Sequence, residues 1–407
     1  MLIFHKNKGI KCSMNTAISR RNFLKTAALG LTALSSKKAF SANTETLRIG
    51  YLPITDAAPL LIAHANGYYQ EEGLKVEKPI SVRTWSNLSE AFLTGKFNVV
   101  HFLLPIPIWM RFNTKAPVKV LAWDHTNGSA ITVRADAGIN SFADLKGRQI
   151  AVPYWYSMHN VILQMGLRKA GLKPVIRPQT SPLKDNESNI FVLPPPDMPV
   201  ALTGKKIDGY IVAEPFNAIG EMKIRAKIMR FSGDIWKNHP CCVIVMNESL
   251  IRSDPVFVQK VVNSIVRAQL WLSHNRAAAA KILSRNGKGY LPTEEEVLQR
   301  VFTGYEISKY GPGASPQAIR HPDWNIARIG FQPYPYPSAT RFIINEMRQT
   351  LMEGDTAFLN KLDIDSAAKE LVDDRFVKQA ISAVGGLEKF ESVNIETPWD
   401  REEIIEF

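Results

Sequence analysis

Residues 47–60 read LRIGYLPITDAAPL, and this stretch decides the fold class. The apolar run 47–52 predicts a buried strand, and residues 57–69 predict the helix that follows it, ended by glycine signals. A strand followed directly by a helix is the repeating unit of α/β sheets with mostly parallel strands. We therefore predict an α/β protein whose first strand begins at Leu47.

The same alternation continues outward from this stretch to about residue 245. Further strands are predicted at residues 75–80, 98–102, 118–123, 130–134, 149–153 and 209–213. Helices are predicted at residues 88–93, 141–145, 158–170 and 200–203. From residue 254 the pattern changes to long amphipathic helices, of which 255–275 is the clearest. Residues 183–199, which contain three consecutive prolines, are expected to form a surface insertion.

Asn127-Gly128 interrupts the pattern between two strands, and the chain returns near residue 242. Two α/β units joined by two crossovers predict a clamshell with a hinge. We expect residues 42–127 together with 243–407 to form lobe 1 with C-terminal helices, and residues 128–242 to form lobe 2. Ligands in such sheets bind outside the carboxyl ends of strands, near helix N-termini.

The formal net charge of +12 is concentrated at the N-terminus. Residues 1–41 contain eight of the fifty Lys and Arg residues and no acidic residue, so the remainder carries only about +4 and does not indicate a nucleic-acid-binding protein. Within that segment, SRRNFLK at 19–25 precedes a short apolar run, the pattern of a twin-arginine signal peptide. We expect export to the periplasm, with translation starting at Met1 or Met14.

Only Cys241 and Cys242 remain after the signal, which excludes a disulfide framework. Three interpretations of this adjacent pair stay open: buried thiols, a vicinal disulfide, or a soft-metal or thiolate contact with the ligand that involves His239 or His159. No later segment is apolar over the length of a membrane span. The mature product is therefore expected not to be membrane-embedded.

Five stretches together resemble one family. They are LRIGYLPITDAAPL (47–60), DLKGRQIAVP (144–153), MHN (158–160), GYIVAEPFNA (209–218) and WKNHP (236–240). Their order resembles the nitrate- and bicarbonate-binding proteins of ABC importers, in a wider group with sulfonate and taurine binders. The resemblance implies a two-lobed periplasmic binding protein of type II that captures a small anion. It implies a monomer that works with permease and ATPase subunits, without catalytic residues and without a required cofactor.

The resemblance also implies a ligand pocket formed by Trp85, Ser129, His159, Glu214 and Cys242. The indole N–H of Trp85 can donate to an oxyanion while the ring forms a wall. His159 lies in the first turn of a helix that Ser157 is expected to cap, where backbone N–H groups also face an anion. Each of these residues has a structural alternative, core packing for Trp85 and a satisfied buried side chain for His159.

Two further residues are candidates on local grounds. Asp56 either caps the helix after the first strand or faces the ligand. The family's nitrate binders have Pro-Glu-Lys where this chain has His239-Pro240-Cys241-Cys242, so the lysine that would pair with nitrate is missing. Arg83 lies two residues from Trp85 on an extended segment, so we predict that Arg83 replaces that charge.

Two other functions remain as alternatives. The fold also occurs in thiamin-pyrimidine synthases, metal-dependent enzymes with a cysteine-rich motif, which Cys241-Cys242 resembles only in part. A binding protein that reports its ligand to a sensory receptor would have the same sequence features. No hydrolase triad pattern or zinc-protease motif is present, so we expect a binding protein and not an enzyme.

Overall fold

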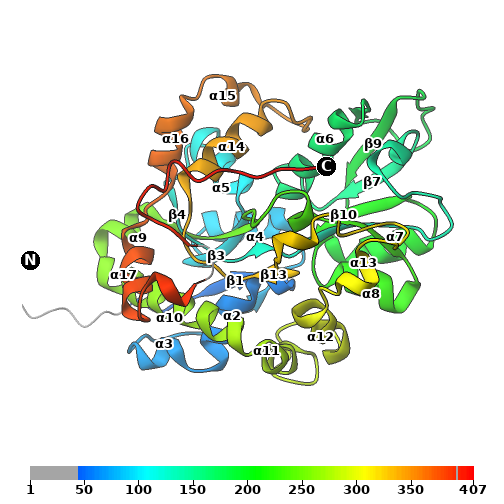
Figure 1. Cartoon of the computed structure of the whole chain (residues 1–407). Coiled ribbons are helices and arrows are strands. Elements are labelled where there is room, and N and C mark those ends of the chain that lie inside the picture. The colour runs from blue at the N-terminus through cyan, green and yellow to red at the C-terminus, as the bar shows by residue number, and fades with distance from the viewer. Residues whose placement is uncertain (1–44, 391–392) are drawn as a thin grey trace, which may run out of the picture. The chain divides into compact units, whose positions relative to one another are not determined.

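The computed structural model describes residues 45–390 and 393–407. The predicted signal peptide (1–41), both candidate start residues and Cys12 lie outside the described residues. Residues 45–407 form one compact unit in which two mixed β-sheets are each flanked by helices (Figure 1).

The first sheet has five strands in the order β2-β1-β3-β12-β4. Its strands are β1 (Ile49–Tyr51), β2 (Ile80–Ser81), β3 (Val99–Leu103), β4 (Val118–Trp123) and β12 (Cys242–Asn247). β1 pairs in parallel with β2 and β3, whereas β12 runs antiparallel to β3 and β4. Every residue of β1 and β3 is buried, which explains why these strands read as continuous apolar runs.

The second sheet has six strands in the order β11-β6-β10-β7-β9-β8. Its strands are β6 (Ser129–Val133), β7 (Gln149–Val152), β8 (Lys173–Val175), β9 (Glu187–Val192), β10 (Gly209–Ala213) and β11 (Lys227–Phe231). The strands from β10 through β8 are parallel, and β6 is antiparallel to β10 and β11. The expectation of mostly parallel pairing therefore holds for part of each sheet only.

The chain passes between the two sheets twice, from β4 to β6 and from β11 to β12. In the first passage, β5 (Thr126–Asn127) pairs antiparallel with β13 (Ile329–Gly330). Thr126 also forms a bridge with Pro240 of the second passage, so the two passages lie side by side. The predicted crossover at Asn127-Gly128 lies in the first passage, while the predicted lobe boundaries stay a prediction.

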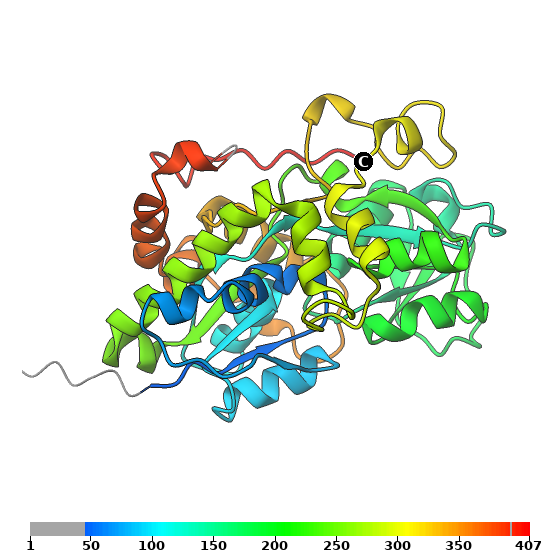
Figure 2. The ribbon, with the colours of Figure 1, turned by 90° about the horizontal axis from the view of Figure 1, so that it is seen from below.

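Helices cover both faces of the sheets (Figures 1 and 2). Those before residue 250 are α2 (Ala58–Ala65), α3 (Tyr68–Glu71), α4 (Trp85–Leu93), α5 (Pro105–Phe112), α6 (Met158–Lys169), α7 (Met198–Thr203) and α8 (Phe216–Ile224). The later ones are α9 (Glu248–Ser253), α10 (Pro255–His274), α11 (Arg276–Leu283), α12 (Glu295–Thr303), α13 (Ile307–Tyr310), α14 (Pro337–Met347), α15 (Ala357–Asn360), α16 (Ile364–Leu371) and α17 (Arg375–Ala383). The long helix α10 packs against α2 and α17, as its apolar stripe predicts.

Two expectations are corrected. The predicted helix 57–69 is broken into α2 and α3, because Gly67 adopts a left-handed conformation with a φ of 79°. Residues 183–199 are not a surface insertion, because β9 lies between β7 and β8. The three prolines follow this strand and do not place it at the surface. Within the strand, Ser188 donates to the Leu145 carbonyl, and Glu187 forms an ion pair with Arg177.

The C-terminal segment runs from α17 on the first-sheet side toward the second sheet (Figure 1, red). The Lys237 N–H donates to the Ile404 carbonyl, and the Phe407 ring meets Phe142 of the second-sheet side at 5.5 Å between centroids. This segment therefore crosses the second passage and connects both halves of the fold.

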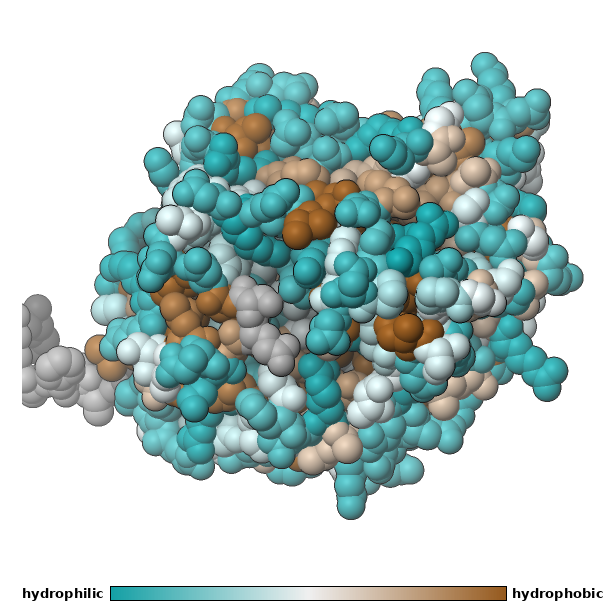
Figure 3. All heavy atoms as spheres, in the orientation of Figure 1, coloured by the Kyte–Doolittle hydropathy of each residue, from teal (hydrophilic) through white to brown (hydrophobic). Residues whose placement is uncertain are grey.

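The visible surface is mostly hydrophilic, with separate hydrophobic patches (Figure 3). The exposed large apolar side chains are scattered over different elements, as is normal for folded proteins. None of the helices in residues 45–390 and 393–407 is long and apolar enough to cross a membrane.

Candidate functional site

Eight buried titratable residues gather where the two passages meet the carboxyl ends of β1, β3 and β4. We call them the central cluster: Asp56, His101, Asp124, His125, His159, His239, Cys241 and Cys242. Each is at most 1% exposed. Burial of so many polar groups at one place is costly unless they are paired with one another or with a bound solute.

The first sheet positions most of these residues. Asp56 lies in a short 3-10 helix (Thr55–Ala57) after β1, and Asp124 and His125 directly follow β4. Cys242 opens β12, which is antiparallel, so its start lies beside the end of β3 at Leu103. The site thus forms at the strand ends where ligands bind in open α/β sheets.

The second sheet adds His159 and Ser129. His159 is in the first turn of α6, and the Ser157 side chain caps that helix by accepting a hydrogen bond from the Asn160 N–H, as predicted. Ser129 begins β6 and its hydroxyl lies 2.9 Å from His159 Nε2. Ser232, which donates to the Ser129 carbonyl, lies 2.8 Å from His239 Nε2. A serine hydroxyl therefore holds Nε2 of His159 and another holds Nε2 of His239.

Asp56 is the charged centre of the cluster. Its Oδ2 atom lies 2.9 Å from His125 Nε2, 3.2 Å from Cys242 Sγ and 3.7 Å from Cys241 Sγ. Burial alone would raise the pKa of Asp56, but the charge and hydrogen bond of His125 outweigh it and lower the pKa. Burial likewise opposes the charge of His125, yet Asp56 holds its pKa well above the usual value. The two residues form a carboxylate–imidazolium pair.

Burial favours the neutral forms of the other three histidines and of Asp124. Burial lowers the pKa of His101 to about 3, of His159 to about 4 and of His239 to about 3. Burial also raises the pKa of Asp124 well above its usual value. The carboxyl groups of Asp56 and Asp124 face imidazoles and not lysine or arginine side chains. The cluster therefore has no net positive charge with which to attract an anion.

Several atoms of the cluster have no hydrogen-bond partner among the described residues. They are Asp56 Oδ1, His101 Nδ1, both carboxyl oxygens of Asp124, His125 Nδ1 and His159 Nδ1. The indole Nε1 of Trp85 is also buried without a partner, and the Trp85 ring lies 5.5 Å from the His101 ring. Because nearly all buried polar groups in folded proteins are hydrogen-bonded, this concentration indicates a site for a polar solute.

The structure brings together five of the seven predicted site residues: Asp56, Trp85, Ser129, His159 and Cys242. The helix-cap alternative for Asp56 is wrong, because its side chain makes no cap hydrogen bond and faces His125 instead. Their contact with a ligand stays a prediction.

The side chains of Glu214 and Arg83 do not join the cluster, although the Glu214 carbonyl accepts from the Thr55 N–H beside Asp56. Glu214 Oε1 accepts from Arg328 Nε at 2.7 Å, and Oε2 accepts from the Ala218 N–H, so this side chain holds the turn after β10. The Arg83 side chain is 63% exposed and pairs with Asp197 at 2.5 Å. The geometry does not support Arg83 as the replacement for the missing lysine.

Sequence reasoning missed His101, Asp124 and His125. Asp124 and His125 follow a predicted strand and precede the Asn127-Gly128 break, so the strand-end rule could have found them. His101 lies inside the apolar run of β3, where nothing in the local pattern distinguishes a ligand from a core residue.

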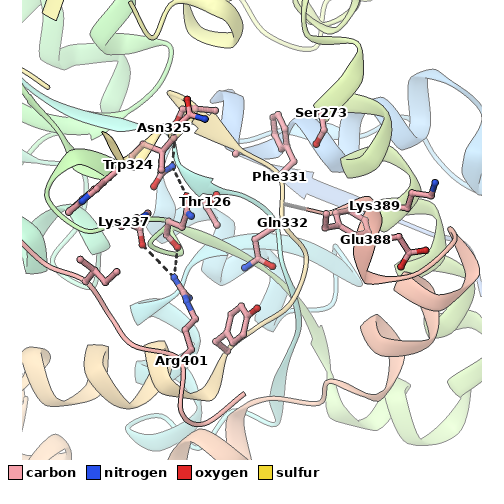
Figure 4. Close-up of a pocket in the computed structure, with 18 of the residues that line it drawn as sticks. Thr126, Lys237, Ser273, Trp324, Asn325, Phe331, Gln332, Glu388, Lys389 and Arg401 are labelled. Carbon is pink, nitrogen blue, oxygen red and sulfur yellow. Dashed lines mark hydrogen bonds between the residues drawn. The ribbon is translucent and has the colours of Figure 1, made fainter. Parts of the chain in front are cut away.

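A cavity of about 860 Å³ is lined by none of the central-cluster residues (Figure 4). It lies beside both passages, with Thr126 from the first and Lys237 from the second on its wall. The Arg401 side chain donates to the Asn238 carbonyl at 2.9 Å there. Two of its lining residues have a pKa shifted by burial, Arg401 downward and Tyr336 upward. The central cluster holds more titratable groups, and they are more deeply buried, so we place the functional site at the cluster.

Comparison with known proteins agrees with this architecture. Residues 41–285, more than half of the chain, match the model described as the NMT1-like family. The nitrate/nitrite binding protein NrtA of Nostoc sp. strain PCC 7120 is 26% identical over 390 residues, which covers 88% of this chain and 84% of that relative.

Two solved structures show the same fold. The periplasmic nitrate-binding protein NrtA from Synechocystis PCC 6803 matches with a TM-score of 0.71 and 20% identity, over 88% of this chain and 93% of that chain. A ligand-binding component of an ABC-type import system from Staphylococcus aureus, with zinc bound, matches with a TM-score of 0.63 and 20% identity, over 83% and 99% of the two chains. At this identity the likeness concerns the fold alone, which is the two-lobed periplasmic binding protein fold of type II.

Proposed function

This chain belongs to the NMT1-like family, and from that premise we propose that it is the solute-binding component of an ABC importer. It captures a small anion at the central cluster. The class of solute is supported by the nitrate/nitrite-binding relative, which covers most of the chain. Nitrite, bicarbonate, cyanate and sulfonates belong to the same chemical class of small anions.

One observation carries this proposal. Unpartnered buried polar atoms from the two sheets converge at one place: Trp85 and His101 belong to the first sheet and its helices, and His159 belongs to the second. A solute that bonds to both sides stabilises the closed arrangement, because it binds the closed state better than the open one.

The N–H groups at the site suit an anion. The indole of Trp85 is a donor only, and a neutral imidazole presents one N–H whose position follows the partner of the other nitrogen. If His159 Nε2 accepts from the Ser129 hydroxyl, Nδ1 carries the proton and can donate to the solute. The N-terminus of α6 adds its partial positive charge on the same side.

We also propose how the chain reaches its partners. The twin-arginine pattern at residues 19–25 supports export to the periplasm, where the loaded protein delivers its solute to permease and ATPase subunits. Export of a green fluorescent protein fused to residues 1–41 tests the signal. Replacing Arg20 and Arg21 by Lys should retain the fusion in the cytoplasm.

Thermal unfolding with a panel of small anions tests solute binding. The full chain is heated alone and with nitrate, nitrite, bicarbonate, cyanate or an alkanesulfonate. A solute at a hundred times its Kd stabilises the folded protein by about 2.7 kcal/mol, which raises the Tm by several degrees. The solute should be recovered unchanged afterwards, whereas conversion to a product would favour an enzyme.

A further inference from the structure

Four residues of the central cluster form a second arrangement of their own. One ligand atom from each of Asp56, His125, Cys241 and Cys242 lies within 4.8 Å of the other three, and all four residues are buried. They come from three separate segments, the helix after β1, the end of β4 and the start of β12. The fold therefore builds this grouping from distant parts of the chain.

The distances suit a four-coordinate metal ion. Tetrahedral zinc with bonds of about 2.0–2.3 Å separates its ligand atoms by about 3.3–3.8 Å. Asp56 Oδ2 lies 3.2 Å from Cys242 Sγ and 3.7 Å from Cys241 Sγ, close to that spacing. The His125 Nε2 contact with the same oxygen, at 2.9 Å, would lengthen slightly.

The donor set favours one class of metal. Two thiolates, one imidazole and one carboxylate are the ligand types of zinc, whereas calcium and magnesium prefer oxygen atoms alone. Asp56 Oδ1 and His125 Nδ1 are buried and have no hydrogen-bond partner within residues 45–390 and 393–407. The donor types and the unpartnered atoms support a metal site independently of the distances between the ligand atoms.

We propose that Asp56, His125, Cys241 and Cys242 bind one zinc-class divalent ion, which offsets most of the negative charge of its own carboxylate and two thiolates. Among the described residues, the carboxyl groups of the cluster face imidazoles and no lysine or arginine. The metal-binding claim is independent of the proposed function.

The direct test uses the full chain, reduced and stripped of metal with a chelator. Zn²⁺ and Co²⁺ are added separately, and bound metal is counted by elemental analysis. We expect one ion per chain, and a thiolate-to-cobalt charge-transfer band in the ultraviolet spectrum. X-ray absorption of the zinc form should show two sulfur ligands. These readouts need no variant, so a folding defect does not affect them.

Variants then identify the ligands. Cys242→Ser, His125→Gln and Asp56→Asn should each weaken zinc binding by at least about a hundredfold, the upper end of the loss seen when a group outside the ligand set is removed. Cys242→Ser should also reduce the charge-transfer band. His274→Gln is the matched control, because His274 is at the C-terminus of α10 and outside the cluster. Circular dichroism shows that each variant is folded. Unchanged affinity in the three cluster variants would overturn the assignment.

The remaining outcomes separate the two claims. Zinc without sulfur ligands, no bound zinc, or a Cys241–Cys242 disulfide in protein isolated from the periplasm overturns the metal site. If nitrate still raises the Tm of such metal-free protein, the proposed function stands alone. If zinc binds through sulfur but no anion of the panel shifts the Tm of either form, the metal site stands and the proposed function is wrong.

Discussion

A single carboxylate oxygen, Asp56 Oδ2, faces the imidazole of His125 and both thiols of the cysteine pair. Because the site is buried, removing any one of these groups leaves its partners without compensation. These residues either bind an ion together or, without an ion, form hydrogen bonds and an ion pair with one another. At the scale of single residues, the chemistry of the chain is concentrated around this atom.

Trp85 tests which side chains touch the solute. Trp85→Phe removes the unpartnered indole N–H and keeps an aromatic wall against His101. A hydrogen bond to a charged group contributes about 1.5–3 kcal/mol, so anion affinity should fall by about tenfold to a hundredfold in calorimetric titration. Trp109→Phe, on α5, is the matched control and should bind as the wild type does. Equal affinities of the two variants would exclude Trp85 from the site.

The His239→Gln variant tests whether the buried imidazole of His239 is neutral in the folded protein. Its pKa is lowered by burial to about 3 from 6.5, so below pH 6.5 the unfolded chain binds a proton that the folded chain does not. The contribution of His239 to the free energy of unfolding therefore falls as the pH decreases from about 6.5 toward 4. His239→Gln should reduce the slope of unfolding free energy against pH there by up to about 1.4 kcal/mol per unit. Urea unfolding at several pH values measures it, and an identical slope in the variant would contradict the assignment.

The passages between the sheets are the elements that create the site. Gly128 in the first passage has a φ of 78°, and a Cβ atom there would lie 3.1 Å from the His125 ring. A side chain at this position would therefore strain the backbone and press against the His125 ring. The adjacent second passage adds His239 and the two cysteines, so both passages fix the cluster together.

Replacing Gly128 by Ala tests this element. The left-handed conformation alone costs a non-glycine residue about 1–2 kcal/mol, and the contact with His125 adds to that. Gly171→Ala is the control, since Gly171 has a φ of 74° and an added methyl group there would meet no atom within 4 Å. Urea unfolding should show the larger loss for Gly128→Ala, together with weaker solute binding. Equal losses and unchanged binding would mean that the close approach is unimportant.

The turn after β10 depends on a buried ion pair. Arg328 and Glu214 are each 1% exposed, and Glu221 lies 3.3 Å from the same guanidinium. Glu214→Ala leaves Arg328 with the weaker partner, so unfolding free energy should fall by about 3 kcal/mol. Arg83→Ala, at an exposed pair, should change it by less than about 1 kcal/mol. A loss no larger than that of the control would show that the pair does not hold the turn.

Much of the fold could be predicted from periodicity, and part of the site could not. β4 and β10 match their predicted ranges, because apolar runs between turn signals determine them locally. β9 was mistaken for part of an insertion because three consecutive prolines follow it, and because its buried polar residues are paired with partners that the local sequence does not reveal. The contact of Asp56 with His125 and the cysteines depends on three segments that meet only in the folded chain.

At the scale of the whole molecule, the two sheets meet at the cluster, and several segments hold them there. The Thr55 N–H donates to the Glu214 carbonyl at 2.9 Å, directly linking the two sides, and the C-terminal segment crosses the second passage. A solute at the cluster adds a bond between the same two sides. Capture by closure is therefore consistent with the way the chain is connected.

Titration calorimetry of the full chain with the anion panel, in metal-free and zinc-loaded forms, tests the central claim most directly. We predict one anion per chain in at least one of the two forms, and a loss of binding in Trp85→Phe and His159→Gln, which remove donors from the first and second sheet. The absence of binding for every anion in both forms, or unchanged binding in both variants, would contradict solute capture at the central cluster.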